Sequence, residues 1–402
     1  MALMPVAEAL QHVLVDAKPL AAEVVSLEEA LGRVLTEDVV ALRTQPPAAV
    51  SAMDGYAVQG SDVAQAPVVL KVIGEVAAGH PFTGKVGPRE AARIFTGGIM
   101  PEGSDTVVIQ EFTTPDPNGV MIQKPTAAGR NVRAEAIDFA QHQILLRKGR
   151  RLSARDLMLA AAMNHSCLSV HRKPAVAILG TGDELVPSGG TPRPGEIVYS
   201  NGFALAALAS GNGGVVHDLG IARDRLDDIA AAVRRARQFG ADILVTSGGA
   251  SVGEHDLVQR ALAAEGLELS FWRVALRPGR PMLHGRLGAM QVLGVPGNPV
   301  SAYVCAFLFL VPLIRKLAGR SDIVDLPLSA RLGRDLPAND ERADYMRATL
   351  EDTQNGPVAT PLPAQDSSLM APLAKADCLL IREPHAPAAA AGSECVILKL
   401  GL

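Results

Sequence analysis

The chain has 402 residues, of which 48% are apolar and 20% charged, with a formal net charge of −4. This length exceeds that of one ordinary hydrophobic core, so two to four domains are expected. The nearly balanced charge gives no basis for nucleic acid or an anionic membrane as a partner, and neither is expected.

Cysteine usage and hydropathy favour a cytoplasmic protein. Cys167, Cys305, Cys378 and Cys395 are far apart and form no CxxC pair, so neither a disulfide framework nor a structural zinc site is expected. The N-terminal residues lack the basic and apolar segments of a signal peptide. The most apolar run, residues 302–314, is shorter than a membrane span of about 20 residues and is expected to be a buried helix.

The N-terminal part suggests a helical unit followed by a β-rich one. Residues 5–40 are expected to be helical, with Ser26 and Glu29 at capping-box spacing. Short β-branched runs between glycine and proline turns then predict a small β domain over 46–138.

A helical pattern returns after this β domain. It covers residues 139–170, and Ser153 or Asp156 is a suitable start for its Ala/Leu/Met-rich stretch. The chain is therefore expected to leave a helical domain, build the β insert and come back. The helical domain would consist of residues 1–45 and 139–172.

From residue 173 onward, apolar strands alternate with helices. The expected strands are 175–179, 215–219, 242–245 and 290–294, and the expected helices begin near residues 200, 224 and 300. Such alternation argues for right-handed crossovers and a mainly parallel sheet. Residues 173–320 are thus assigned to an α/β domain, and the β-like pattern that follows predicts a C-terminal β-domain over 321–402.

Three loops follow strands of this sheet: GTGDE (180–184), TSGGASVGEHD (246–256) and VPGNP (295–299). Ligands of parallel sheets bind beyond the carboxyl ends of the strands. The three loops are therefore expected to meet in one crevice.

The second loop allows two interpretations. Its small residues would let backbone amides approach a ligand closely, and its acids would suit a cation. Residues 249–253 also match GxSxG, the nucleophile elbow of hydrolases, with Ser251 as the nucleophile. Asp256 is too near in sequence to be the usual acid of such an enzyme, and His284 and His385 lie in no evident motif.

Each remaining motif also has a plain structural interpretation. GTGDE lacks the third glycine of a dinucleotide fingerprint, because Leu185 stands there. The prolines of VPGNP are ordinary turn and helix-start residues, but they would also stiffen a pocket wall.

A basic cluster brackets a Pro-Gly pair and consists of Arg273, Arg277 and Arg280. It looks more like an oxyanion clamp than a solvated edge. Asp54-Gly55 alone is a common hairpin turn.

Taken in order, these motifs resemble the MoeA and gephyrin E-domain family of molybdopterin molybdenumtransferases. The matching segments, which span essentially the whole chain, are SAMDGYAV, FTGGIMPEGSDTVVIQE, GRNVRAEAIDF, ILGTGDEL, SNG, TSGGASVGEHD, RPGRP and GVPGNPVSAYV. The resemblance implies an α/β and β multidomain fold. It would be an elongated four-part subunit with a helical segmented domain, a β insert, a central mainly parallel pterin-binding α/β domain and a C-terminal β-domain.

The resemblance also implies a reaction and partners. The substrates would be adenylylated molybdopterin and molybdate, and molybdenum would be inserted at the dithiolene sulfurs with Mg²⁺-dependent release of AMP. A homodimer is implied, in which the insert of one subunit closes the crevice of the other. Transient contacts with molybdopterin adenylyltransferase and with molybdoenzyme maturation factors are also implied.

Site residues follow from the motifs. The residues implied for catalysis are Asp54, Thr96, Asp138, Glu184, Asp224 and Asp256, and those for the metal are Asp183, Glu184, Asp224 and Asp256. Those implied for substrate binding are Gly182, Ser247, Gly248, Gly249, Ser251, Gly253, Arg273, Arg277, Pro296, Gly297, Asn298, Pro299 and Ser367. Family members often carry lysine where the three arginines stand, and Gln365-Asp366-Ser367-Ser368 matches its motif loosely, which leaves Ser367 and Ser368 as alternatives.

The residues themselves agree with this chemistry. Several carboxylates would repel a pyrophosphate unless a divalent cation lay between them, and Mg²⁺ prefers carboxylate and phosphate oxygens. The alternatives are a related pterin-binding adenylyltransferase or nucleotide hydrolase, which would not need the insert, and a serine hydrolase using Ser251.

Overall fold

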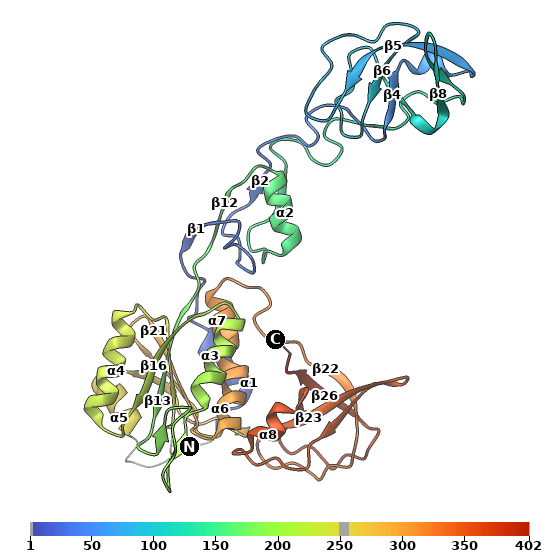
Figure 1. Ribbon diagram of the computed structural model, residues 1–402. Coiled ribbons are helices and arrows are strands. Elements are labelled where there is room, and N and C mark those ends of the chain that lie inside the picture. The colour runs from blue at the N-terminus through green and yellow to red at the C-terminus, as the bar shows by residue number, and fades with distance from the viewer. Residues whose placement is uncertain (1–2, 249–256, 402) are drawn as a thin grey trace.

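The computed structural model describes residues 3–248 and 257–401. Figure 1 shows an elongated subunit with the β insert at one end and a small unit of short strands and one helix in the middle. At the other end, an α/β body lies beside a C-terminal sheet. The expected elongated, multidomain arrangement is therefore confirmed.

The α/β body is built on one six-stranded sheet. Its order is β16 (Val215–Ala222), β13 (Ala175–Thr181), β17 (Ile243–Ser247), β21 (Met290–Val295), β20 (Leu283–Leu287) and β18 (Glu268–Phe271). The first four strands are parallel to one another, whereas β20 pairs antiparallel with both β21 and β18. Strands β17 and β21 are buried along their whole length, as expected of central strands with both faces covered. The mainly parallel sheet predicted from the alternation is confirmed.

Helices cover both faces of this sheet. Helices α4 (Leu226–Gln238) and α5 (Leu257–Ala264) pack on one face, and α1 (Val6–Leu14), α3 (Asn201–Gly211), α6 (Pro299–Cys305) and α7 (Val311–Leu317) pack on the other. Helix α1 therefore belongs by packing to the α/β body, although residues 1–45 were expected to form one helical domain. Its buried Ala9 and Val13 join the core beneath α7, which a local pattern cannot reveal.

Helices α6 and α7 form one continuous helical run through a π-helical turn, η3 (Ala306–Leu310). Within the described residues this run, Pro299–Leu317, is the one helix long and apolar enough to cross a membrane, and 78% of its most apolar window is buried inside the protein. The burial identifies it as the expected core helix.

The β insert forms a second six-stranded sheet. The order is β7 (Thr106–Ile109), β4 (Gly55–Val58), β6 (Glu90–Ile94), β5 (Val68–Val76), β9 (Gly119–Ile122) and β8 (Thr113–Asp116), with short 3-10 turns η1 (Gly60–Val63) and η2 (Gln110–Phe112). Two separate apolar clusters fill it. A two-residue pairing of β3 (Val50–Ser51) with β10 (Val132–Arg133) closes its base.

The middle unit is less helical than expected. Residues 22–40 contain β1 (Ala22–Ser26) and β2 (Val39–Val40), which pair with β12 (Cys167–His171) and β11 (Ile144–Leu146). Ser26 therefore ends a strand and does not cap a helix. The helical expectation is wrong here because the pairing partners lie more than a hundred residues away, and such long-range pairing overrides local periodicity.

The predicted second helix of this unit is confirmed in part. Helix α2 covers Ala154–Ala162 only, and it begins with the expected residues, because Ser153 is its N-cap and Asp156 completes a capping box. The rest of 139–170 is strand and loop. The unit is thus a small mixed domain through which the chain passes twice.

The C-terminal domain is a six-stranded sheet with one short helix, α8 (Met370–Ala374). Its order is β19 (Leu276–Arg277), β23 (Ala343–Thr353), β24 (Gly356–Pro361), β22 (Leu328–Leu332), β26 (Glu394–Lys399) and β25 (Cys378–Arg382), with β23 also pairing with β25. Strand β19 comes from the α/β segment of the sequence. This pairing ties the α/β body to the C-terminal sheet.

Candidate functional site

The three glycine-rich loops begin where β13, β17 and β21 end at the same edge of the sheet. A side chain at Gly248 would lie 2.4 Å from the carbonyl oxygen of Thr181, and one at Gly297 would lie 3.7 Å from the Cα of Gly248. The described parts of the three loops thus touch one another. Their predicted convergence is confirmed, and glycine is required at position 248, where φ is +100° and no Cβ fits.

Asn201, the first residue of α3, joins two of these loops. Its side-chain amide donates to the hydroxyl of Ser247 and to the carbonyl of Gly297, both at 2.8 Å. Asn201 was not among the predicted site residues, although it lies in the SNG motif directly after Tyr199. An asparagine at the start of a helix is usually explained as a cap, so only the fold reveals that it fastens the crevice.

The Tyr199 side chain supports the same corner. Side chains added at Gly180 or Gly202 would meet its ring at 2.6 Å or less, so the ring fills the space that both glycines leave. Its hydroxyl is buried without a hydrogen-bond partner within the described structure. Burial, and the charge of Asp218, raise the pKa of Tyr199 to about 12. The hydroxyl therefore stays neutral and serves packing.

Three of the predicted acids lie together at this edge. The backbone N–H of Asp224 donates to the carboxylate of Asp183 at 3.2 Å, and the Glu184 carboxylate folds back over Gly182, where an added Cβ would lie 2.6 Å from it. Gly182 itself is fixed by a 3.2 Å hydrogen bond to the carbonyl of Ala222, at the end of β16. The loop after β13 and the loop after β16 thus form one acidic corner.

The electrostatics of this corner show that the carboxylates interact. Partial burial, and the charges of Asp183 and Glu184, raise the pKa of Asp224 above its usual value. Carboxylates held close together, with no lysine or arginine of the described residues paired to them, are a feature of functional sites.

The acidic corner does not form a complete cage. Over residues 3–248 and 257–401, no three His, Cys, Asp or Glu side chains are arranged to hold a metal ion by themselves. Four of the predicted site residues lie outside the described residues: Gly249, Ser251, Gly253 and Asp256. A Mg²⁺ ion usually takes one or two carboxylates and completes its shell with waters and substrate phosphates, so Asp183, Glu184 and Asp224 fit this requirement.

The C-terminal domain reaches the crevice at the VPGNP loop. Asn298 donates to the Ser367 hydroxyl at 2.8 Å, and the Val300 N–H donates to the Ser367 carbonyl at 3.0 Å. Ser368 instead donates to the carboxylate of Asp366. Of the two predicted alternatives, the structure therefore brings Ser367 to the loop.

A pocket of about 410 Å³ opens beside this contact. Its walls come from α3, α6 and α8, together with Leu400, and include Asn201 and Pro299. Within the VPGNP loop, Pro296 is buried, whereas Gly297 and Asn298 are exposed. The pocket size suits a small organic ligand adjoining the acidic corner.

The arginines behave differently from one another. Arg277 donates to Asp340, Asn339 and Asp344 at 2.9, 2.8 and 2.6 Å. The hydrogen bond from Arg277 to Asp344 and the nearby carboxylates raise the pKa of Arg277. With its donors directed at two acids, Arg277 joins β19 to the C-terminal domain, and these contacts do not support an oxyanion clamp at this position.

Arg273 remains available. It follows β18, which runs in the same direction as β21 because both pair antiparallel with β20, so Arg273 leaves the sheet at the crevice edge. Its guanidinium lies 5.6 Å from the Trp272 ring and makes no ion pair with any described residue. Arg280 is exposed and its carbonyl accepts a hydrogen bond from Val274.

In the insert, Asp54 and Thr96 form a close pair. Both the backbone N–H and the hydroxyl of Thr96 donate to the Asp54 carboxylate at 2.7 Å. These bonds, the backbone one first, lower the pKa of Asp54 below its usual value. Asp138 lies at the root of the insert, where its N–H donates to Gln45, and the described contacts do not join it to this pair.

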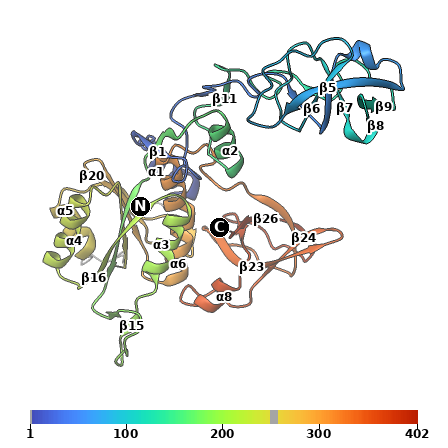
Figure 2. The same ribbon diagram turned by 45° about the horizontal axis from the view of Figure 1, so that its top comes forward.

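The insert and the crevice lie at opposite ends of one subunit. Figure 2 shows strands β5 to β9 at one end and β15 (Ile197–Val198), the partner of β14 (Leu185–Val186) beside the acidic corner, at the other. Asp54 and Thr96 therefore do not meet Glu184 or Asp224 within one chain.

His284 does not support a serine hydrolase. It is buried within β20, its Nε2 lies 3.1 Å from the Gln291 side chain, and burial lowers its pKa. Ser251 lies outside the described residues.

Comparison with known families covers nearly the whole chain. Residues 4–164 match the MoeA N-terminal region (domain I and II), residues 177–316 a probable molybdopterin binding domain, and residues 329–400 the MoeA C-terminal region (domain IV).

Individual relatives agree with these matches. The chain is 33% identical to the molybdopterin molybdenumtransferase of Haemophilus influenzae over 94% of both chains. It is 40% identical to that of a Nostoc species over 74% of this chain and 70% of the relative. A crystal structure of a molybdopterin biosynthesis MoeA protein from Pyrococcus horikosii superposes with a TM-score of 0.85 and 30% identity over the full length of both chains.

Proposed function

Because the chain belongs to the MoeA family of molybdopterin molybdenumtransferases, an enzyme family of molybdenum cofactor biosynthesis, we propose that its crevice takes adenylylated molybdopterin and molybdate. Water would add at the phosphorus of the pterin phosphate, so that the phosphoanhydride bond breaks, AMP leaves and molybdopterin keeps a phosphate monoester. Molybdenum would bond to the two dithiolene sulfurs while one oxygen of the molybdate takes the two thiol protons and leaves as water.

The meeting of Asp183, Glu184 and Asp224 at the carboxyl edge carries this proposal. Three mutually repelling carboxylates beside a ligand pocket are unfavourable in the free protein, and they become favourable once a cation and a phosphate are present. These acids would hold Mg²⁺, with Asp256 as a further expected ligand. When bound, Mg²⁺ would polarise the phosphoanhydride and stabilise charge on the departing AMP.

The neighbouring loops would position the substrate. At Gly182, Gly248 and Gly297 there is no side chain to keep a ligand from the backbone, and Asn201 fixes two of these loops relative to each other. We place the pterin end in the 410 Å³ pocket along α3 and α6, where Asn201 and Pro299 form part of the wall. The position of these loops would thus set the distance between the phosphoanhydride and the acids.

Molybdate would be held by Arg273. Its guanidinium carries no carboxylate partner within the described residues and lies at the crevice edge. An arginine fork matches the oxygens of a tetrahedral oxyanion well. Arg277 would act indirectly by keeping the C-terminal domain, and with it Ser367, in place.

The paired Asp54 and Thr96 would complete the site of a second subunit. Their distance from the crevice of their own chain excludes a role there, so we propose a homodimer in which each insert covers the partner's crevice. We further propose that the enzyme is cytoplasmic. It would receive its substrate from molybdopterin adenylyltransferase and pass its product to molybdoenzyme maturation factors.

Glu184→Gln and Asp224→Asn test the proposal. Each change keeps the shape of the side chain but removes one carboxylate, so molybdate-dependent AMP release should fall by about 100-fold or more. AMP release would be measured with and without Mg²⁺ on adenylylated molybdopterin, together with far-UV circular dichroism as a check of folding.

Glu268→Gln is the matched control. This glutamate faces solvent on β18, away from the acidic corner, so AMP release should stay at the wild-type rate. Wild-type rates in both Glu184→Gln and Asp224→Asn would show that the acidic corner does not act in the reaction.

A further inference from the structure

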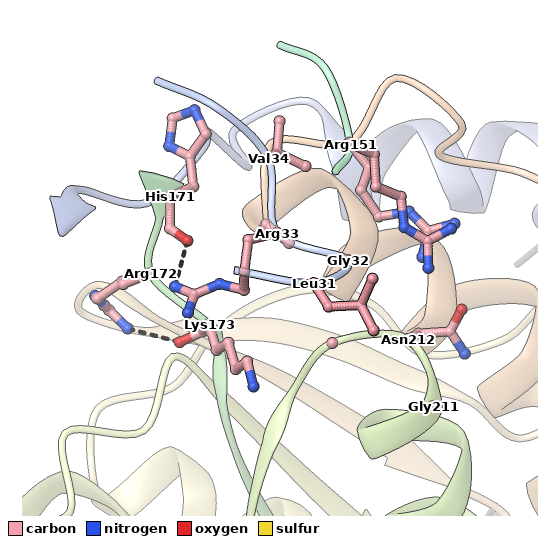
Figure 3. A pocket seen from close by; sticks show the side chains of 13 residues that line it. Leu31, Gly32, Arg33, Val34, Arg151, His171, Arg172, Lys173, Gly211 and Asn212 are labelled. Carbon is pink, nitrogen blue, oxygen red and sulfur yellow. Dashed lines mark hydrogen bonds between the residues drawn. The ribbon is translucent and has the colours of Figure 1, made fainter. Parts of the chain in front are cut away.

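A second cavity, of about 160 Å³, lies far from the crevice between the middle unit and the α/β body (Figure 3). It is lined by Leu31, Gly32, Arg33, Val34, Arg151, His171, Arg172, Lys173, Gly211, Asn212, Gly213, Ala318 and Arg320. Five of these residues are lysine or arginine, and none is an acid. The reaction proposed above uses none of them.

Carboxylates outside the cavity compensate part of this charge. Arg33 pairs with Glu23, Arg172 donates to both oxygens of Asp242 at 2.7 and 2.6 Å, and Arg320 pairs with Asp322. Each of these acids approaches its arginine from outside the ring of lining residues. Three of the five cations are thus neutralised and held in place.

The other two cations, Arg151 and Lys173, are exposed, and no described carboxylate lies closer to either than 3.8 Å. Arg151 comes no closer than 3.8 Å to Asp322, whose two oxygens already accept hydrogen bonds from Arg320. Lys173 makes no ion pair or side-chain hydrogen bond with any described residue. Burial, followed by the charges of Arg320 and Arg315, lowers the pKa of Arg151, although Asp322 opposes this. A guanidinium held against another guanidinium is stabilised by an added anion.

Two helix ends offset part of the remaining charge. Helices α3 and α7 both end at the cavity, at Gly211 and Leu317, and a helix C-terminus carries roughly half a negative charge. Several of their last carbonyls already accept hydrogen bonds, from Asn212, Ala318 and Gly319. An excess of about one positive charge therefore persists after these ends are counted.

The size of the cavity limits the ligand. A volume of 160 Å³ equals the share of about five water molecules in the liquid. A nucleotide or a pterin needs several hundred Å³, whereas a tetrahedral oxyanion with a few bridging waters fits.

We propose that this cavity binds a tetrahedral oxyanion of the phosphate, sulfate or molybdate type between Arg151 and Lys173. Figure 3 shows Arg33, Arg172 and Lys173 on one side of the cavity and Arg151 on the other. Arg33 and Arg320, whose side chains are 8% and 6% exposed, form its rigid back. The exposed Arg151 and Lys173 side chains make no hydrogen bond to a described residue and are free to donate to the anion.

Such an anion would connect two parts of the molecule. Arg33 and Arg151 belong to the middle unit, which leads to the insert, whereas Arg320 follows α7 of the α/β body and Lys173 lies on the connection between the two. Binding would therefore hold the middle unit against the α/β body, and the anion concentration would affect how firmly the insert is positioned.

The test compares the full chain with an Arg151→Gln/Lys173→Gln double variant. Equilibrium dialysis with labelled phosphate, and thermal unfolding with phosphate, sulfate or molybdate, are run at constant ionic strength set with NaCl. The wild-type protein should bind phosphate, and each anion should raise Tm beyond the effect of NaCl. The double variant should bind phosphate at this site at least about tenfold more weakly, because two charge-assisted contacts are lost.

The control is Arg147→Gln, which removes an arginine whose side chain is 71% exposed and pairs with Asp38 outside the cavity. It should bind phosphate like the wild type. The Tm shifts with phosphate, sulfate and molybdate are then compared to identify the physiological anion. A site for molybdate should give a larger shift with molybdate than with phosphate or sulfate.

Crystals soaked in tungstate provide a second measurement that does not depend on the variants. An anomalous peak between Arg151 and Lys173 is expected. No anion binding by the wild type, equal binding by the double variant, or tungstate found only elsewhere would each overturn the proposal.

Discussion

The crevice at the sheet edge and the Asp54–Thr96 pair in the insert are both well-defined polar sites, but they differ in what surrounds them. The crevice has acids, glycine-rich loops and a pocket of about 410 Å³ contributed by one chain. The insert offers a carboxylate fixed by two hydrogen bonds of 2.7 Å, and among residues 3–248 and 257–401 no acid of the crevice lies near it.

The carboxylates of the two sites are therefore held in different ways. A carboxylate that accepts two hydrogen bonds stays ionised and keeps one orientation, which suits a group that must meet a substrate presented by another subunit. The acids of the crevice are instead destabilised by their own proximity. Under the proposed function, the crevice would take up a cation and a substrate, and the insert would act on the crevice of a second chain.

Asn201→Ala would loosen the crevice while leaving all its acids in place. We expect it to reduce activity more than Arg277→Gln or Asp156→Asn. The hydroxyl of Ser247 and the carbonyl of Gly297 would each lose a 2.8 Å hydrogen bond. Because a displacement of about 1 Å near the reacting groups can cost about 100-fold in rate, kcat/KM for AMP release should fall by about 10- to 100-fold.

Steady-state kinetics against wild type would measure this effect. The control is Asn118→Ala, in the exposed turn between β8 and β9, which should leave both kcat and KM at their wild-type values. A rate within twofold of wild type for Asn201→Ala would mean that the loops keep their positions without it.

Arg277→Gln separates the two roles considered for this arginine. Asp344, whose side chain is 14% exposed, and Asp340 would lose their shared partner. We expect the free energy of unfolding to fall by about 1–3 kcal/mol, while the KM for molybdate stays within about twofold. Denaturant unfolding and molybdate titration measure the two quantities, and a raised KM with unchanged stability would restore the oxyanion role.

Asp156→Asn should affect stability alone, because Asp156 lies in the middle unit, away from both sites. Burial opposes its ionisation, but hydrogen bonds from Ser153 and Arg150 outweigh burial and lower its pKa. A carboxylate with a lowered pKa stabilises the folded state above its unfolded pKa of about 3.9, and this contribution is lost as the pH falls through the folded value.

At pH 7 the variant should therefore lose about 1–2 kcal/mol of unfolding free energy, with AMP release unchanged. The difference from wild type should shrink as the pH is lowered below about 4. Thermal unfolding of both proteins across this range is the measurement, and a difference that does not depend on pH would contradict the assigned role of the charge.

The sequence was most informative where local pattern and topology coincide. In 173–320 each predicted strand and helix is present, and the rule that loops meet at the carboxyl edge predicted that the loops after β13, β17 and β21 converge. The position of Asp224 beside Glu184 was implied only by the family resemblance. The capping box at Ser153 is equally local, since all its partners lie within one turn of helix.

The failures have a common physical cause. Residues 22–26 become a strand because they pair with residues 167–171, and Arg277 turns from the crevice because Asp340 and Asp344 approach from another domain. Neither partner is visible in the local pattern. Asn201 was missed for the same reason, because its two acceptors come from separate loops.

The most direct test of the account is complementation between subunits that carry different defects. Asp54→Ala and Glu184→Gln protomers would each be inactive alone, and they would be mixed after reversible dissociation. In a heterodimer with shared sites, one site would carry both defects and the other neither. Random mixing should therefore restore about one quarter of the wild-type rate of AMP release, and no restored activity in proven heterodimers would contradict a site built from two chains.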